Sequence, residues 1–272
     1  MEGMEAKIYL KHFDPNYDKT SAGTIYFRDE INSDSVLYLI DLMESAFVYY
    51  QYKELNINIE SPGGSVSALD LIIDKFKEFQ ERKKNITTKA VMAAASAAAI
   101  MVTAGDIGKR GVNKNSFILY HKSRISEEKT ITVNKLDELR AELIKIDEKM
   151  LDFLVERGLK TLEFNFKKIC SDRSIGKNRI AEQYVNDLLQ VIKERTIYFK
   201  NEEKLESLKD EYLDKFRQYY NSIKNFEPED DETETVKNIK DIFYGIYDSL
   251  TDNDFRLSPE EAQSLFLIDR VI

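Results

Sequence analysis

The chain has 272 residues, an apolar fraction of 42% and a formal net charge of -9. This length and composition suit one large globular domain or two modest ones, and the acidic balance argues against a nucleic-acid or anionic-membrane surface. The single cysteine, Cys170, excludes an internal disulfide framework, and no Cys/His cluster has the spacing of a zinc site.

The N-terminal residues carry charges throughout, so we expect neither a signal peptide nor a membrane-spanning helix there. Together with the cysteine count, this predicts a cytoplasmic protein. Residues 1–23 contain Pro15 and the run DPNYDKTSAG, which predict an irregular segment. One of the two histidines of the chain, His12, lies in it.

Residues 24–125 alternate between strand-like and helix-like patterns. Hydrophobic alternation predicts strands, and apolar residues at helical spacing predict the helices between them. The strands are expected over 24–31, 54–59, 86–92 and up to residue 121, and the helices over 35–47, after residue 65 and within 93–104. Strands connected through helices require crossovers, so this region predicts a layered α/β domain.

The run AAASAAAIMVTA, residues 93–104, is almost entirely alanine and small aliphatic residues and contains a single serine, Ser96. The preceding strand would deliver this serine to a strand-to-helix turn, where backbone N–H groups stabilise negative charge. Small side chains allow the backbones to approach closely. A plainer alternative is an Ala-rich buried helix whose serine bonds to its own backbone.

A serine becomes a nucleophile when a base takes its proton and a third group orients that base. His121 closes the strand that follows the Ala-rich run, so neighbouring strand ends would bring His121 and Ser96 within reach. The pair Gly63-Gly64, directly after another strand, supplies backbone donors without side chains for an oxyanion. The N–H of Ala97 is a second candidate donor.

The second half of the chain predicts helices. Residues 126–159 contain a long amphipathic helix whose apolar stripe needs a partner surface, such as a second copy of the protein. Residues 160–235 predict an amphipathic helical insertion ending in the acidic run EPEDDETE, which is typical of a solvated loop. Residues 236–272 return to a compact pattern, and Ser258-Pro259-Glu260-Glu261 is a strong helix start.

Three segments resemble the proteolytic subunit of the Clp protease, ClpP. The string INIESPGGSVSALDLIIDKF resembles that family's INSPGG segment and following helix. AAASAAAIMVTAGDIGKRGVNKNSFILYH is similar to its nucleophile helix, its AG-x-x-GKR turn and the strand that leads to the catalytic histidine. TDNDFRLSPEEAQSLFLIDRVI resembles its catalytic-aspartate segment. The resemblance covers residues 24–157 and 236–272.

The resemblance implies a ClpP/crotonase-like α/β fold of layered β-α units with a long handle-type helix, here elaborated by the insertion. It assigns Ser96 as nucleophile, His121 as general base and Asp254 as orienting carboxylate. The N–H groups of Gly64 and Ala97 become the oxyanion hole. Residues Gly63, Ser65 and Val66 become part of the substrate-binding loop. No metal or organic cofactor is required.

The implied activity is a serine endopeptidase that cleaves extended polypeptides inside a ring-forming homo-oligomer, with an AAA+ ATPase unfoldase as a further partner. Neither nucleic acid nor membrane is an expected partner. Three alternatives remain open: a catalytically silent scaffold that assembles through the insertion, a phage head-maturation protease of the same superfamily, and an acyl-CoA hydratase/isomerase. The last shares the fold and the glycine pair but lacks this triad.

Several positions depart from the family pattern. Glu60 replaces the asparagine before Ser-Pro-Gly-Gly, and the His-Gln-Pro motif reads His121-Lys122-Ser123. The Tyr-Gly-Leu turn reads Leu265-Phe266-Leu267, which removes a glycine. Asp252 lies two residues before Asp254, and only the alignment to the family selects Asp254.

Overall fold

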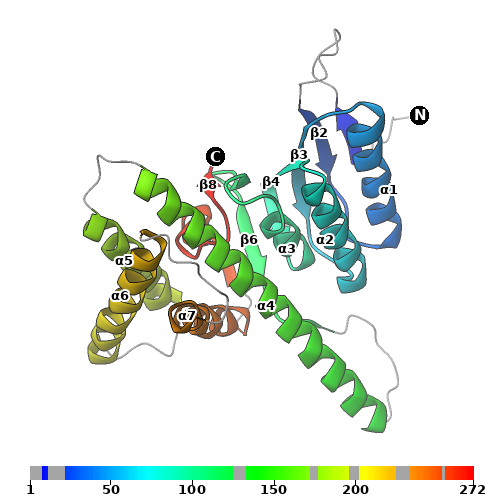
Figure 1. Ribbon diagram of the computed structural model, residues 1–272. Helices are drawn as coiled ribbons and strands as arrows, with labels where there is room; N and C mark the ends of the chain where they lie inside the picture. The colour runs from blue at the N-terminus through cyan, green and yellow to red at the C-terminus, as the bar shows by residue number, and fades with distance from the viewer. Residues whose placement is uncertain are drawn as a thin grey trace. The chain divides into compact units, whose positions relative to one another are not determined.

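The computed structural model describes residues 8–11, 22–124, 133–171, 177–195, 202–224, 233–252 and 255–272. The chain divides into two compact units (Figure 1). The first contains Met1–Tyr120, Arg256–Gln263 and Ile268–Ile272, and the second contains His121–Phe255 and Ser264–Leu267.

The first unit is built on a sheet that is mostly parallel. Its path is β1-β2-β3-β4-β5-β8, while β6 pairs with both β4 and β7. Only β1 is antiparallel to its neighbour in the registers that the described residues define. The strands are β1 (Ile8–Lys11), β2 (Gly23–Phe27), β3 (Glu54–Ser61), β4 (Asn85–Ala95), β5 (Arg110–Val112), β6 (Phe117–Tyr120), β7 (Phe255–Leu257) and β8 (Arg270–Val271). This confirms the α/β prediction.

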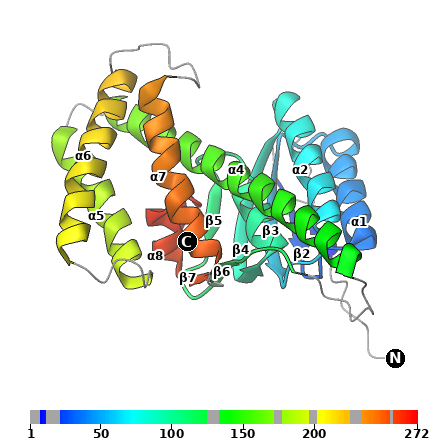
Figure 2. The same cartoon turned by 90° about the horizontal axis from the view of Figure 1, so that it is seen from below.

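The helices α1 (Ser33–Glu44), α2 (Val66–Glu81) and α3 (Ala97–Thr103) cover one face of this sheet (Figures 1 and 2). Strand β3 alternates strictly between buried and half-buried residues, so Leu55, Ile57 and Ile59 face the helices. The buried side chains of α2 recur every three or four residues along one face of the helix, which packs against β4: Ala68, Leu69, Ile72, Phe76 and Phe79. The core of the unit therefore lies between β3, β4 and these helices.

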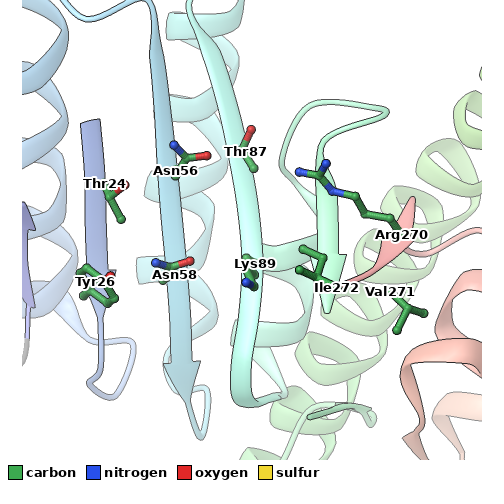
Figure 3. Close-up of a pocket in the computed structure, with 9 residues that line it drawn as sticks. All are labelled: Thr24, Tyr26, Asn56, Asn58, Thr87, Lys89, Arg270, Val271 and Ile272. Atoms are coloured by element: carbon green, nitrogen blue, oxygen red, sulfur yellow. The ribbon is translucent and has the colours of Figure 1, made fainter. Parts of the chain in front are cut away.

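The other face of the sheet is polar and carries a hollow of about 430 Å³. Its lining alternates with the core residues along β2, β3 and β4, and the C-terminal residues of the chain complete it. Figure 3 shows these side chains on the face away from the helices: Thr24, Tyr26, Asn56, Asn58, Thr87, Lys89, Arg270, Val271 and Ile272.

An ion pair ties β5 to the C-terminal segment. The guanidinium of Arg110 is fully buried and donates from Nε and Nη2 to the two carboxylate oxygens of Asp269, each at 2.8 Å. The backbone N–H of Arg110 also donates to Asp269 Oδ2, at 2.8 Å. A planar fork matched to a carboxylate is the strong form of such a pair. Arg110 and Asp269 each directly precede the residues that pair between β5 and β8, which are Gly111 with Arg270 and Val112 with Val271.

The second unit is helical. It contains α4 (Val133–Ser171), α5 (Lys177–Arg195), α6 (Glu202–Lys224) and α7 (Glu234–Thr251), and α6 packs against both α5 and α7 (Figure 2). Its core is rich in aromatic rings: Phe166, Tyr184, Phe216, Tyr219, Tyr220, Phe243, Tyr247 and Phe266. Within the described residues no helix is both long and apolar enough to cross a bilayer.

Gly158 allows α4 and α7 to approach each other. A Cβ at this position would lie 2.3 Å from the Tyr247 hydroxyl. That hydroxyl is buried and donates to the carbonyl of Leu265 at 2.6 Å. The tyrosine therefore links α7 to the turn after α8 (Pro259–Ser264).

Several elements differ from the sequence-based expectation. Residues Ile8–Lys11 form strand β1 within a segment expected to be irregular. Helix α4 continues to Ser171, well into the stretch treated as an insertion. Helix α7 belongs to the second unit, whereas Arg256–Gln263 and Ile268–Ile272 belong to the first. The reason is that the buried stripe of α7 packs on α4 and α6, which a single sequence does not reveal. Most of the acidic run, over residues 227–232, lies outside the described residues.

The predicted helix start at Ser258 is confirmed. The Ser258 hydroxyl accepts from Glu261 N at 3.2 Å, and Glu261 Oε2 accepts from Ser258 N at 2.6 Å. This reciprocal pair is a capping box.

Candidate active site

Ser96 is the single residue between β4 and α3, as the sequence predicts. Its backbone has φ 56° and ψ -127°, a conformation that L residues with side chains rarely adopt. A strained strand-to-helix turn of this kind is how a nucleophilic serine is presented in hydrolases. The turn is fixed on one side by β6, because Ser96 N donates to the Leu119 carbonyl at 2.8 Å.

Gly63 brings a second segment of backbone against this turn. Its φ is +98°, and a Cβ would lie 2.5 Å from the Ala95 carbonyl oxygen and 2.6 Å from Ser96 Cβ. A side chain here is therefore excluded by space and by backbone conformation. The loop that ends β3 reaches the serine only because this residue is glycine.

Gly64 is held in place by Ile31. The Gly63 carbonyl accepts from Ile31 N at 2.7 Å, and Ser65 N donates to the Ile31 carbonyl at 2.7 Å. A Cβ on Gly64 would meet the Ile31 oxygen at 2.1 Å. This role of Ile31 could not be predicted from the sequence, because nothing in an apolar residue after a strand indicates that its backbone holds another loop.

Two N–H groups at this place remain available. Among the described residues, neither Gly64 N nor Ala97 N donates a hydrogen bond. Both belong to segments that meet at Gly63, where an added Cβ would also lie 3.1 Å from Ala97 N. The first unit thus brings together Ser96, Gly63, Gly64 and Ala97, four of the predicted site residues.

Ser65 and Val66 begin helix α2. The hydroxyl of Ser65 accepts from Ala68 N at 3.3 Å, so it is the N-cap of the helix. The helix start thereby fixes the end of the glycine loop. Substrate binding by Ser65 and Val66 remains a prediction.

Glu60 stands where the family pattern has asparagine. Its carboxylate lies 3.6 Å from Arg28 Nε, and both side chains are partly exposed. The ion pair connects the end of β3 with the residue after β2. It compensates the charge that the substitution adds next to the glycine loop.

His121 follows β6 directly and is the first residue of the second unit. Its Nδ1 lies 2.6 Å from the Lys122 carbonyl oxygen. A carbonyl only accepts, so this contact places the proton of a neutral ring on Nδ1 and leaves Nε2 as an acceptor. This is the tautomer that a general base acting through Nε2 requires.

Asp252, the alternative to Asp254 as orienting carboxylate, is the C-cap of α7. Asp254 falls outside the described residues, so its role stays a prediction. Asp252 is described, and its Oδ1 lies 2.5 Å from Lys122 Nζ. Asp252 is therefore engaged with a lysine. Within the described ranges no group of three or more His, Cys, Asp and Glu side chains is arranged to hold a metal ion.

Comparison with known proteins decides the family. The sequence profile of the Clp protease family matches residues 16–202, more than half of the chain. The chain belongs to the Clp protease family. The matched range contains the glycine loop, the Ser96 turn and His121, and the described α/β unit agrees with the fold of this family.

Three Clp protease relatives show how far the likeness extends. A stretch of 111 residues is 33% identical to proteolytic subunit 4 of Streptomyces avermitilis, covering 41% of this chain and 47% of that protein. Over 94 residues the identity to proteolytic subunit 3 of Frankia casuarinae is 35%, covering 35% and 41% of the two chains. Proteolytic subunit 1 of Tropheryma whipplei is 26% identical over 185 residues, which is 66% of this chain and 86% of that subunit. The chain spans about half the length of the first curated relatives it matches.

Proposed function

We propose that this member of the Clp protease family is a serine endopeptidase that hydrolyses extended polypeptides. The observation that carries the proposal is the Ser96 turn. A polar side chain occupies a strained backbone conformation beside a glycine loop, and two N–H groups there have no acceptor among the described residues. Strain maintained at one serine by the surrounding packing is typical of a functional site.

The proposed reaction begins with attack of Ser96 Oγ on a peptide carbonyl. His121 Nε2 takes the hydroxyl proton, and the tetrahedral oxyanion accepts hydrogen bonds from Gly64 N and Ala97 N. The proton then passes from His121 to the leaving amine, which leaves an acyl-enzyme on Ser96. Water, deprotonated by His121, releases the acyl group and restores the serine.

The register of the neighbouring strands β4 and β6 supports the proposal that Ser96 and His121 act together. Ala95, before Ser96, pairs with Leu119 in the parallel ladder of β4 and β6, and His121 directly follows the end of β6. Carboxyl ends of neighbouring parallel strands lie at one sheet edge. Asp254 is proposed as the carboxylate that orients the ring in the active state.

The specific test is labelling with a fluorophosphonate, which reacts with activated serines. We expect the wild-type protein to gain one adduct at Ser96, seen by peptide mass spectrometry, and Ser96→Ala to gain none. His121→Ala should abolish both labelling and cleavage of a fluorogenic peptide. Labelling that persists in Ser96→Ala would contradict the assignment of the nucleophile.

A catalytically silent scaffold is the second candidate, favoured by one observation. Among the described residues the partner of His121 Nδ1 is a carbonyl, with no carboxylate in that place. A scaffold would give an assembled particle without labelling. The oligomeric state is therefore measured in the same sample by sedimentation velocity.

We further propose that the active form is a homo-oligomer in the cytoplasm, fed by an ATPase as the names of the relatives suggest. The first half of α4 supports the oligomer, because its apolar stripe is exposed or half-exposed: Leu136, Leu139, Leu143, Ile146 and Met150. Such a stripe is expected to be covered by another copy of the chain.

A further inference from the structure

The loop His121-Lys122-Ser123 is fastened to two helices of the second unit. Lys122 N donates to the Thr251 carbonyl at the end of α7, at 3.2 Å. Lys122 Nζ lies 3.0 Å from Asp248 Oδ1 and 2.5 Å from Asp252 Oδ1. On the other side, Ser123 N donates to Asp147 Oδ1 on α4 at 2.7 Å.

The same loop holds the imidazole. The Lys122 carbonyl that accepts from His121 Nδ1 belongs to the residue whose N–H and side chain both bind α7. Movement of the α7 end would therefore move the atom that fixes the ring. Asp252 also stands two residues before Asp254, so Lys122 binds the start of the segment that carries the predicted carboxylate.

Two of these links depend on the departures from the family motif. A proline at position 123 has no N–H, so it could not donate to Asp147. A glutamine at position 122 is neutral and could not form ion pairs with two carboxylates. The replacement of Gln-Pro by Lys-Ser thus creates the links to both α4 and α7.

Stability alone does not explain the arrangement. The side chain of Lys122 is 38% exposed and those of Asp248 and Asp252 are each 51% exposed. Ion pairs at such positions typically contribute little to the free energy of unfolding. The main consequence of these ion pairs is that they hold the loop His121-Lys122-Ser123 against the end of α7.

We propose that Lys122 is a positioning residue, which fixes the His121 ring and the end of α7 relative to each other for catalysis. This inference rests on the proposed function. The helical unit would then contribute to catalysis, because α7 would hold the loop that orients the proposed general base.

The test compares Lys122→Met with Lys122→Arg in the assembled full-length protein. For Lys122→Met we expect kcat for a fluorogenic peptide to fall by roughly 10- to 100-fold with KM changed by less than about twofold, because misplaced groups lower the rate of the chemical step. Lys122→Arg retains the charge and should restore most of kcat. Lys75→Met is the matched control, because Lys75 also bridges two carboxylates, Glu44 and Glu78, on helices α1 and α2.

The pH dependence separates positioning from a general loss of structure. Among the described residues, the charged groups that contact the loop include Lys122 itself, Asp248 and Asp252 from α7, and Asp147 from α4. Removing the ammonium breaks both ion pairs that hold the loop on α7, while the hydrogen bonds of Lys122 N and Ser123 N remain. The pH profile of kcat/KM should therefore change in Lys122→Met and keep its shape in Lys75→Met.

A second readout does not need activity. In a His12→Gln background His121 is the only histidine, and diethylpyrocarbonate reacts only with its neutral ring. The rate of this modification at fixed pH, followed by mass spectrometry, should differ between Lys122→Met and the protein with Lys122, because the loop that holds the ring is released from α7, and it should be the same in Lys75→Met. If the wild type fails to react with fluorophosphonate, the proposed function fails, and this measurement still tests the role of Lys122.

The outcomes are decisive in both directions. Unchanged kcat and an unchanged rate of His121 modification in Lys122→Met would overturn the proposal, as would an equal loss in Lys75→Met or no recovery in Lys122→Arg. If Lys122→Met does not fold by circular dichroism, Lys122→Gln replaces it. This variant keeps a polar side chain of similar length and is expected to show the same loss of kcat.

Discussion

At the scale of single residues, the Ser96 turn depends on Gly63. We expect Gly63→Ala to lower peptide hydrolysis by more than about 100-fold and to lower the free energy of unfolding by roughly 1–3 kcal/mol, because the new Cβ would collide with Ala95 and Ser96 at a φ of +98°. Fluorogenic-peptide assays and urea denaturation measure the two effects. Gly245→Ala is the matched control, since nothing lies within 4 Å of its added Cβ in helix α7. Wild-type turnover in Gly63→Ala would contradict the described turn.

The pair of Arg110 and Asp269 permits a second prediction at this scale. Asp269→Asn leaves a fully buried guanidinium without its counter-charge, so we expect the free energy of unfolding to fall by about 3–5 kcal/mol. Glu156→Gln, which breaks an exposed pair with Lys160 on α4, should change it by less than about 1 kcal/mol. Chemical denaturation of both variants checks the contrast. Equal losses in the two variants would show that the buried pair contributes no more to the free energy of unfolding than the exposed pair.

At the scale of elements, the turn after α8 shows how a missing glycine is accommodated. Phe266 occupies φ 58°, the left-handed region that favours glycine, and its ring is buried against Tyr184, Phe216 and Phe243. Aromatic packing therefore offsets the backbone strain.

This balance predicts the effect of restoring glycine at position 266. The backbone strain that Phe266→Gly relieves is worth about 1–2 kcal/mol, whereas losing a buried phenylalanine ring costs about 3–5 kcal/mol. We therefore expect a net loss of roughly 1–4 kcal/mol in thermal or urea unfolding. Phe266→Leu, which keeps part of the apolar packing, should lose less than Phe266→Gly. A more stable Phe266→Gly would mean that the strain outweighs the packing.

Elements of the first unit were largely predictable from the sequence, because strands and helices there carry clear periodicity. The Ala-rich run shows where that signal ends. Residues up to Ala95 extend β4 and those from Ala97 form α3, yet alanine fits either state, so only the placement of Ser96 at the turn could be predicted. The N-cap of α1 is Asn32, whose side chain accepts from Ser35 N. Asparagine, serine and aspartate are all favoured N-caps, so the sequence Asn32-Ser33-Asp34 does not single out one of them.

Features that depend on distant partners could not be predicted. The links from Lys122 to α7 and from Ser123 to α4 join segments whose separation in the chain hides them. Phe266 was identified as a departure from the family pattern, but its aromatic partners lie on α5, α6 and α7. Asp254 remains assigned by resemblance alone.

At the scale of the whole molecule, the exposed stripe on α4 is the feature that a monomer does not explain. The side chain of Leu136 is 54% exposed, and Leu139 and Leu143 continue the stripe on the same helix face in half-buried positions. Fully burying a leucine contributes about 1.5–3 kcal/mol, so a few such residues in two copies suffice to drive association. The stripe is therefore the proposed contact between copies.

The decisive variant carries Leu139→Glu and Leu143→Glu together, which places two charges in the proposed contact. We expect it to sediment as a smaller species than the wild type at the same concentration, with unchanged helix content by circular dichroism, because burying unpaired carboxylates is strongly unfavourable. Ile144→Glu is the matched control. This residue is 47% exposed on the same helix but about 100° around the axis from Leu143, so its charge should remain in solvent and the oligomer should persist. If Ile144→Glu alone dissociates, or if the double variant keeps the oligomer, the contact lies on another surface. A wild-type protein that is monomeric at all concentrations would contradict the proposed homo-oligomer.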